Sequence, residues 1–487
     1  MKKVVRSGWR HLARSCGLLL WVGLVQAITL TAVQAAPQVL NPEEARHFLV
    51  RTGFAPSQAQ VDALVGKNTL QVIGSTVEQA QATQAQHPAP AFVAQPLPAP
   101  IQSLATQEER MAARQLQLRQ GLDIKTWWLR EMVESDAPLK ERMTLFWHNH
   151  FATSQQKVVR SVPMWNQHQL LRSQALGSFA TLLHAVAKDP AMLAYLDGAN
   201  SRKEAPNENF AREVMELFVL GEANQADQGL GGYTEKDIRE AARAFTGWSL
   251  ERETFSFRFR PQFHDPGVKT VLGTTGPLDG DAVLDILLKQ DAAARFVVRK
   301  LWLEFVSATP LDAEVERLAK GFRASGYQLA PLMKLLLASD AFWAPENRTA
   351  LVKSPVELLV GSARQFKLPV PDTMPLAIKS AQLGQNLLVP PNVKGWPGYT
   401  HWITASSLLE RKRFSQSLLQ PASPIAWDAP AWLQAQGLRP DTEPDKTQQQ
   451  RLALLLLGHA NVQTVADGTV GMGWLKALMA DPAYQLK

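Results

Sequence analysis

The chain has 487 residues, of which 46% are hydrophobic and 20% are charged, and its formal net charge is +7. A chain of this length and apolar content can bury a large core, and at about 100 to 200 residues per domain it is expected to form two or three lobes. Removal of residues 1–35 would lower the net charge to +2, because that segment carries five Lys or Arg residues and no Asp or Glu. A nucleic-acid partner is therefore not expected, since phosphate binding needs a concentrated basic surface.

The first 35 residues are predicted to be a secretory signal peptide. Basic residues precede an apolar run over residues 17–25, and small residues then lead to a cleavage site after Ala35. The single cysteine, Cys16, would leave with this segment, so the mature chain is expected to form neither a disulfide nor a thiolate metal site. No later run approaches the roughly 20 apolar residues of a membrane span, which predicts a periplasmic or extracellular protein. An uncleaved signal acting as a membrane anchor is the alternative.

Helical periodicity dominates the remaining chain. Capping residues indicate where several helices begin, among them Asn41, Asp189 before Pro190, and Thr234 with Asp237 in capping-box spacing. The expected helices cover residues 42–53, 57–65, 108–133, 190–197, 207–220, 281–289, 292–306, 312–325, 330–338, 354–366, 406–419, 451–457 and 474–480, with two more that begin at Pro138 and after Thr234.

One segment has the period of a strand instead. Between Thr254 and Arg260, phenylalanines alternate with polar residues, and the expected partner strand is Val268–Gly273 across a turn at 263–267. The predicted fold is therefore mainly α, a multi-helix globular body with one small β-hairpin and Pro-rich linkers.

Proline-rich stretches suggest the domain boundaries. Residues 79–102, rich in Ala, Gln and Pro, are interpreted as an insertion on the surface of a main helical domain, 36–420. A second stretch, 421–448, is interpreted as a linker to a C-terminal helical pair, 449–487, that packs on the main body.

Two histidines in Trp147–Phe151 are candidates for chemistry. On a helix, His148 and His150 lie about 200° apart and cannot bind one metal ion, whereas a helix that ended at His148 or Asn149 would bring both rings to one side. The alternative is one hydrogen-bonded core histidine and one surface histidine.

Glu213 is a candidate because it lies inside an apolar helical arc, near its edge. A carboxylate in that position must be paired, protonated or bound to a cation. It is predicted to be either a metal ligand and catalytic group or the partner of a buried arginine, such as Arg239 or Arg243.

Two further groups come from irregular segments. His264 with Asp265 in a turn is predicted to supply a metal ligand and a base that orients it, although Asp265 would also serve simply to cap the turn. A second group follows in the segment 386–402 and is predicted to line a sugar- or aromatic-binding surface, with filling of a helix interface as the alternative. Its members are Lys394, Trp396, His401 and Trp402.

Several segments together resemble one bacterial family, the domain of unknown function 1800. The segments that carry the resemblance are Phe48–Phe54, Phe146–Phe151, Asn207–Gly221, Gly232–Trp248, His264–Gly273, Lys353–Glu357 and Asn386–Trp402. The resemblance implies export and, as a partner, an exported protein of the domain of unknown function 1501 family, but it implies no reaction. Relatives often carry a histidine in the segment equivalent to residues 216–218, where this chain has Phe218.

Two functions fit these residues. The first is a metal-dependent, hydrolase-like enzyme that uses a divalent metal, because imidazole and carboxylate groups suit such a metal and hydrolysis makes the fewest demands on them. Its ligands would be His150, His264 and Glu213, with Asp265, Glu213 and His148 as catalytic groups. The second is a non-catalytic helical scaffold that binds an exported partner protein or a cell-envelope polymer through Trp396 and Trp402.

Overall fold

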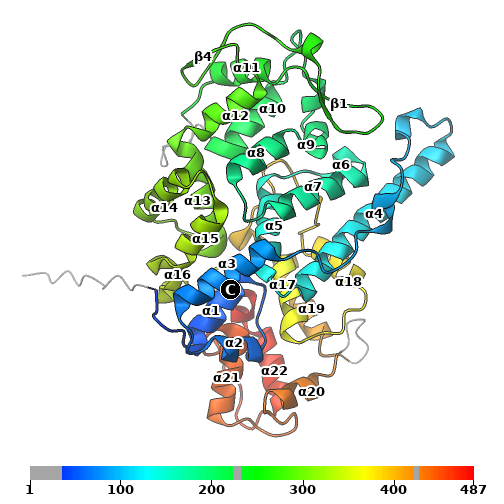
Figure 1. Ribbon diagram of the computed structural model, residues 1–487. Coiled ribbons are helices and arrows are strands. Elements are labelled where there is room, and N and C mark those ends of the chain that lie inside the picture. Colours follow the sequence, from blue (N-terminus) through cyan, green and yellow to red (C-terminus); the bar gives the residue numbers. More distant parts are fainter. Residues whose placement is uncertain (1–35, 223–231, 421–426) are drawn as a thin grey trace, which may run out of the picture. The chain divides into compact units, whose positions relative to one another are not determined.

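Helices account for most of the protein, as a computed structural model shows for residues 36–222, 232–420 and 427–487 (Figure 1). The predicted signal segment with Cys16, and residues 223–231 and 421–426, lie outside this description. The described residues belong to one compact unit, 34–487. Within these ranges there are 22 α-helices and two small antiparallel sheets, which confirms the predicted mainly α fold with little β-structure.

The first helices follow the predicted capping signals closely. Asn41 caps the first helix and Thr234 forms a capping box with Asp237 on a later one. The helices up to residue 220 are α1 (Pro42–Thr52), α2 (Gln58–Leu64), α3 (Thr69–Ala82), α4 (Gln107–Glu134), α5 (Pro138–His150), α6 (Gln155–Val158), α7 (Ser161–Ser173), α8 (Phe179–Ala187), α9 (Pro190–Tyr195), α10 (Glu208–Glu213) and the π-helix η4 (Val214–Leu220). Helices α6 and α7 lie in a stretch for which the sequence predicts no helix.

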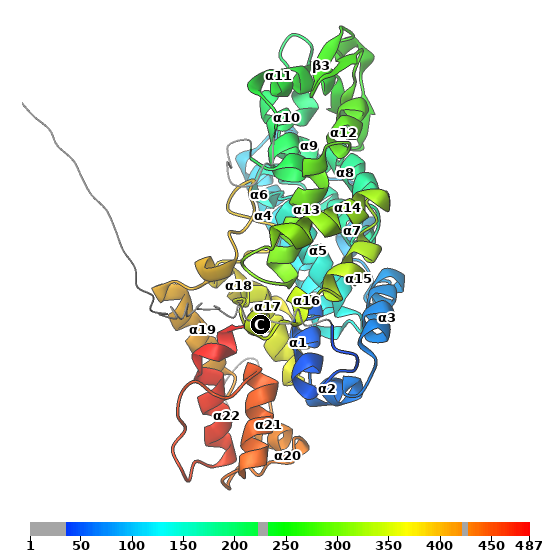
Figure 2. The ribbon, with the colours of Figure 1, turned by 90° about the vertical axis from the view of Figure 1, so that its left-hand side faces the viewer.

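The remaining helices are α11 (Glu235–Ala244), α12 (Gly280–Leu288), α13 (Asp291–Phe305), α14 (Asp312–Ala324), α15 (Leu329–Leu337), α16 (Asp340–Trp343), α17 (Pro355–Gln365), α18 (Met374–Gln382), α19 (Ala405–Ser417), α20 (Ala429–Ala435), α21 (Lys446–Leu457) and α22 (Gly471–Ala480). The last helices pack together, with α22 in contact with α19, α20 and α21 (Figure 2). Helix α5 contacts α1, α3, α4 and α7 and is therefore surrounded by other helices.

The strands form two hairpins, and the predicted strand pairing is wrong. Strand β2 (Phe257–Phe259) lies in the predicted strand but pairs with β1 (Trp248–Leu250), while β3 (Lys269–Val271) pairs with β4 (Thr274–Gly276). Leu272 and Gly273 both have positive φ angles, 49° and 79°, as a tight two-residue hairpin turn requires. That turn joins β3 to its nearest neighbour in sequence and leaves β2 to pair with β1.

The two Pro-rich stretches contain ordered structure. In the stretch 79–102, α3 continues to Ala82, and Phe92 is buried. The stretch 421–448 contains α20, whose Trp432 packs edge-on against Phe366 at a centroid distance of 5.1 Å. In both stretches a buried aromatic ring anchors a segment whose proline content alone suggests an extended chain.

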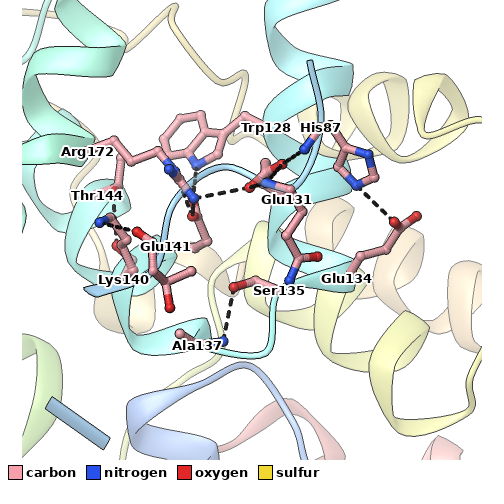
Figure 3. A network of polar contacts seen from close by, with 12 residues as sticks. His87, Trp128, Glu131, Glu134, Ser135, Ala137, Lys140, Glu141, Thr144 and Arg172 are labelled. Atoms are coloured by element: carbon pink, nitrogen blue, oxygen red, sulfur yellow. Dashed lines mark hydrogen bonds and ion pairs between the residues drawn. The ribbon is translucent and has the colours of Figure 1, made fainter. Parts of the chain in front are cut away.

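A buried ion network joins α4, α5 and α7 (Figure 3). Arg172 donates to Glu141 at 2.8 Å and to Glu131 at 3.0 Å, and both carboxylates are fully buried. Trp128 Nε1 donates to the second oxygen of Glu141 at 3.0 Å. Burial raises the pKa of Glu141, and the Arg172 charge opposes that rise. The network therefore depends on one guanidinium that compensates two carboxylates.

The same network holds the first Pro-rich stretch against α4. The Glu131 carboxylate accepts hydrogen bonds from the backbone N–H groups of Gln86, at 2.9 Å, and His87, at 2.8 Å. His87 Nε2 also lies 2.8 Å from Glu134. This stretch, interpreted from its sequence as a surface insertion, is thus tied to the buried ion network.

We predict that Arg172→Met lowers the free energy of unfolding by about 3–5 kcal/mol, because it leaves Glu131 and Glu141 buried and uncompensated. Urea denaturation at pH 7 measures the change. The matched control is Arg212→Met: Arg212 makes two hydrogen bonds of 2.7 Å to Glu235, but on the surface, where such a pair is worth about 1 kcal/mol or less. Equal losses in the two variants would contradict the prediction.

Candidate functional site

Both histidines of Trp147–Phe151 belong to helix α5. The helix continues through His150, and Phe151 N–H still donates to the carbonyl of Trp147 at 2.8 Å. The extended arrangement that would let His148 and His150 bind one metal ion is therefore not formed. Both rings are buried, so neither is the surface histidine of the alternative interpretation.

His148 points into the core between α4 and α7. Its Nε2 lies 3.0 Å from Nδ1 of His168, and its ring packs on Trp128 at a centroid distance of 4.5 Å. Burial lowers the pKa of His148 to about 3, so the ring is neutral at physiological pH. Its surroundings are those of a core residue in a histidine pair.

Glu213 ends α10 and is half-buried. Burial raises the pKa of its carboxyl, the neighbouring Glu216 raises it further, and Lys394 and Arg212 oppose the rise. Among the described residues it has no ion-pair or hydrogen-bond partner. The expected pair with Arg243 is not formed, because Arg243 is engaged by Glu240 and Asp265.

His264 and Asp265 are held by residues at and just after the end of α11 and by their own turn. His264 Nδ1 lies 2.9 Å from the carbonyl oxygen of Thr246. Asp265 accepts from Gly267 N–H at 2.8 Å and from Arg243 at 2.7 Å, and the guanidinium holds the pKa of the Asp265 carboxyl below its usual value. Asp265 therefore caps the turn and pairs with an arginine.

The predicted metal ligands do not meet. Across the described part of the chain, no group of three or more His, Cys, Asp or Glu side chains is placed to hold a metal ion. His150 Nε2 is occupied by the carbonyl oxygen of Phe218 at 2.9 Å, while His264 Nδ1 faces the carbonyl oxygen of Thr246. The proposed set of His150, Glu213 and His264 is therefore not assembled, because carbonyl groups and not carboxylates face the rings.

A cavity of about 260 Å³ lies beside α5, and it collects part of the predicted binding surface. Lys394, Trp396 and Trp402 line it, together with His150. His401 is exposed and does not line the cavity. The other lining residues are Leu145, Phe146, Asn149, Lys300, Leu303, Glu304, Leu351, Val352, Ser354, Glu357, Gln385, Pro397, Gly398, Tyr399 and Lys487.

Asn149 attaches the tryptophan segment to α5. Its side-chain oxygen accepts from the backbone N–H of Trp396 at 2.6 Å, and its amide nitrogen donates to the Trp396 carbonyl at 3.3 Å. Gly395 has a φ of 81°, and a Cβ there would collide with the Asn149 side chain. The Lys394-Gly395-Trp396 sequence therefore lets the backbone approach the end of α5 closely enough to form one wall of the cavity.

Buried charges form another wall. Arg142 pairs with Glu304 and Glu357, and the Lys487 ammonium also contacts both carboxylates. Burial opposes the ionisation of Glu304, but Lys487 and Arg142 outweigh it and hold its pKa below the usual value. The wall is thus a compensated cluster of two carboxylates and two cations.

Sequence reasoning did not identify this second wall. Glu357 forms a capping box with Ser354 at the start of α17, and a capping signal of that kind indicates a helix terminus only. Glu304 and Lys300 belong to an amphipathic helix, where charged residues are ordinary. The site becomes visible only when the structure brings α5, α13 and Lys487 together.

The fold and cavity define a mainly helical protein with an aromatic and charged cavity beside one central helix. The chain belongs to the family described as Protein of unknown function (DUF1800), whose model matches residues 47–486. The comparisons with curated proteins and with solved structures gave no match. Among the described residues, no helix combines the length and hydrophobicity that a membrane crossing requires.

We predict that His148 stays neutral in the native protein far below pH 6.5. Its pKa falls from an ordinary 6.5 to about 3 on folding, so the unfolded chain binds the proton first as the pH drops. Below pH 6.5, this group therefore lowers the free energy of unfolding by about 1.4 kcal/mol for each pH unit. Denaturation at pH 7 and pH 5 should show wild type losing about 2 kcal/mol more than His148→Gln. Equal losses would show that His148 titrates normally.

Proposed function

We propose that this protein is an exported binding protein that holds one small polar unit of a cell-envelope polymer in the cavity beside α5. The observation that carries the proposal is the joining of Trp396 and Trp402 with charged and polar side chains in one cavity. Aromatic faces cover the C–H face of a sugar ring, while polar groups around the ring can bind its hydroxyl and amide groups.

The size of the cavity supports a single-unit ligand. Its volume of about 260 Å³ lies just below the roughly 300–1,000 Å³ of pockets that bury a drug-sized molecule. One sugar ring or one amino-acid side chain fits such a volume, whereas a folded segment does not. A polymer would therefore enter with a terminal or branching unit.

The burial of the tryptophans favours a ligand that enters the cavity over a protein that docks on its rim. Trp396 is 4% exposed and Trp402 is 8% exposed. An anchor residue of a protein interface projects into a pocket on its partner, whereas these rings belong to the wall of a cavity and do not project from the surface. Binding of an exported partner of the domain of unknown function 1501 family is the competing outcome of the experiment below.

A binding function is preferred to the metal-dependent hydrolase, because the residues predicted as metal ligands are not brought together in the described part of the chain. Export rests on the order of basic, apolar and small residues in the first 35 positions.

We predict that Leu303→Phe weakens retention of the protein on purified peptidoglycan sacculi by at least about tenfold, because the added ring occupies the cavity that Leu303 lines. Co-sedimentation with sacculi measures retention. The matched control is Leu335→Phe, which adds the same ring at a position 43% exposed and outside the cavity. Melting temperatures of both variants verify that each is folded.

A second pair of variants separates the cavity from its surroundings. Trp402→Ala removes a cavity wall and should lower retention about tenfold or more, whereas His401→Ala, its exposed neighbour, should bind as wild type does. If the wild-type protein is not retained on sacculi, and instead captures an exported protein in a manner that requires Trp402, the ligand is a protein partner and not a polymer.

A further inference from the structure

One cation in the cavity has no counter-charge among the residues that the structure describes. Lys394 pairs with Glu222, and Lys487 pairs with Glu357 and Glu304. Lys300 lines the same cavity but forms no ion pair or hydrogen bond with any described residue; its ammonium lies 5.1 Å from the centroid of the Phe296 ring. A desolvated ammonium without an anion costs free energy, and a ligand anion would recover it.

The nearest carboxylate on the same helix is not free to neutralise Lys300. Glu304 follows one turn later on α13 and is engaged by Arg142 and Lys487. The Arg142 and Lys487 charges already compensate Glu304 and Glu357. Within the described part of the chain, the cavity therefore carries one uncompensated positive charge at Lys300.

An unpartnered acceptor lies in the same cavity. His150 Nε2 faces the carbonyl oxygen of Phe218 at 2.9 Å, and a carbonyl only accepts, so the neutral ring must carry its proton on Nε2. Its Nδ1 is buried and has no hydrogen-bond partner among the described residues. Burial, and then the charge of Lys300, lower the pKa of His150 well below its usual value, so Nδ1 is a lone-pair acceptor near Lys300.

We infer that the cavity binds an acidic sugar unit, with Lys300 paired to its carboxylate or phosphate and His150 Nδ1 accepting from one of its N–H or O–H groups. This inference rests on the proposed function and narrows it from polar units in general to anionic ones. A neutral sugar would leave the Lys300 charge uncompensated, whereas an acidic sugar satisfies both unpartnered groups.

The pH dependence of binding gives an independent signature. Burial lowers the pKa of Lys300 to about 8, so the free protein loses this charge above pH 8, and affinity for an anion should then fall about tenfold per pH unit. The other ionisable groups at the cavity are His150 from α5, Glu304 from α13, Glu357 from α17, Tyr399 from the turn η7 (Tyr399–Trp402), Lys394 and Lys487. Lys487 is another lysine of the cavity whose pKa is lowered by burial. The fall in affinity is therefore assigned to Lys300 only if it disappears in a Lys300 variant.

Isothermal titration calorimetry of the purified protein with three probes tests the inference. N-Acetylmuramic acid carries a carboxylate, N-acetylglucosamine 6-phosphate carries a phosphate, and N-acetylglucosamine is the neutral counterpart of both. We expect at least one acidic probe to bind about tenfold or more tighter than the neutral one at pH 7. Lys300→Gln should reduce this preference to about twofold or less, while the exposed Lys320→Gln should keep the preference of wild type.

The outcomes separate the inference from the function on which it rests. Equal binding of acidic and neutral probes to wild type overturns the inference and supports the proposed function. A preference that survives Lys300→Gln overturns the assignment to Lys300. Absence of binding by all three probes overturns both. Because Lys300→Gln removes an unpaired charge, its melting temperature should not fall, which shows that any loss of affinity is not a loss of folding.

Discussion

The structure depends on the burial of opposite charges on two sides of α5. Glu141 and Arg142 are adjacent in sequence, and since successive residues on a helix point about 100° apart they enter different clusters. Glu141 joins the Arg172 network that ties α5 to α4 and α7, while Arg142 compensates Glu304 and Glu357. Charges taken out of water must be matched with good geometry, so these pairs restrict how the surrounding helices can pack.

This constraint also explains where the cavity lies. Asn149 and His150 lie at the end of α5. The Asn149 side chain fixes the tryptophan segment through two hydrogen bonds to the backbone of Trp396. Arg142, nearer the start of the same helix, holds Glu304 and Glu357 in the charged wall of the cavity. A single rigid helix thus positions both the aromatic and the ionic parts of the site.

The binding hypothesis and the enzyme hypothesis make opposite demands on the histidines. A metal centre needs at least three nitrogen or oxygen ligands that converge on one point, with second contacts that orient them. Here His148 faces another histidine in the core, and His150 faces a carbonyl. Binding requires a polar group in the cavity wall that lacks a partner. His150 lines the cavity, and its Nδ1 has no hydrogen-bond partner among the described residues.

Local sequence was sufficient wherever local energetics decide. Capping boxes and apolar periodicity predicted most helices and the mainly α fold, and the alternation of Phe257 with its neighbours predicted a strand. The Lys394–Trp402 segment was predicted to line a sugar- or aromatic-binding surface, with filling of a helix interface as the alternative. Three of its four candidate residues line the cavity.

Tertiary structure alone decided which groups meet. The strand pairing followed a tight turn at Leu272 and Gly273 that periodicity does not reveal. His150 and Glu213 look like ligands on a helical wheel, but whether a buried polar group meets a carboxylate, a carbonyl or an empty cavity depends on the element packed against it. Lys300 gained its significance through the cavity that it lines, and Glu304 and Lys487 gained theirs through contacts with residues far away in the chain. Periodicity determines which side of a helix is buried, whereas the chemistry facing that side is set by long-range packing.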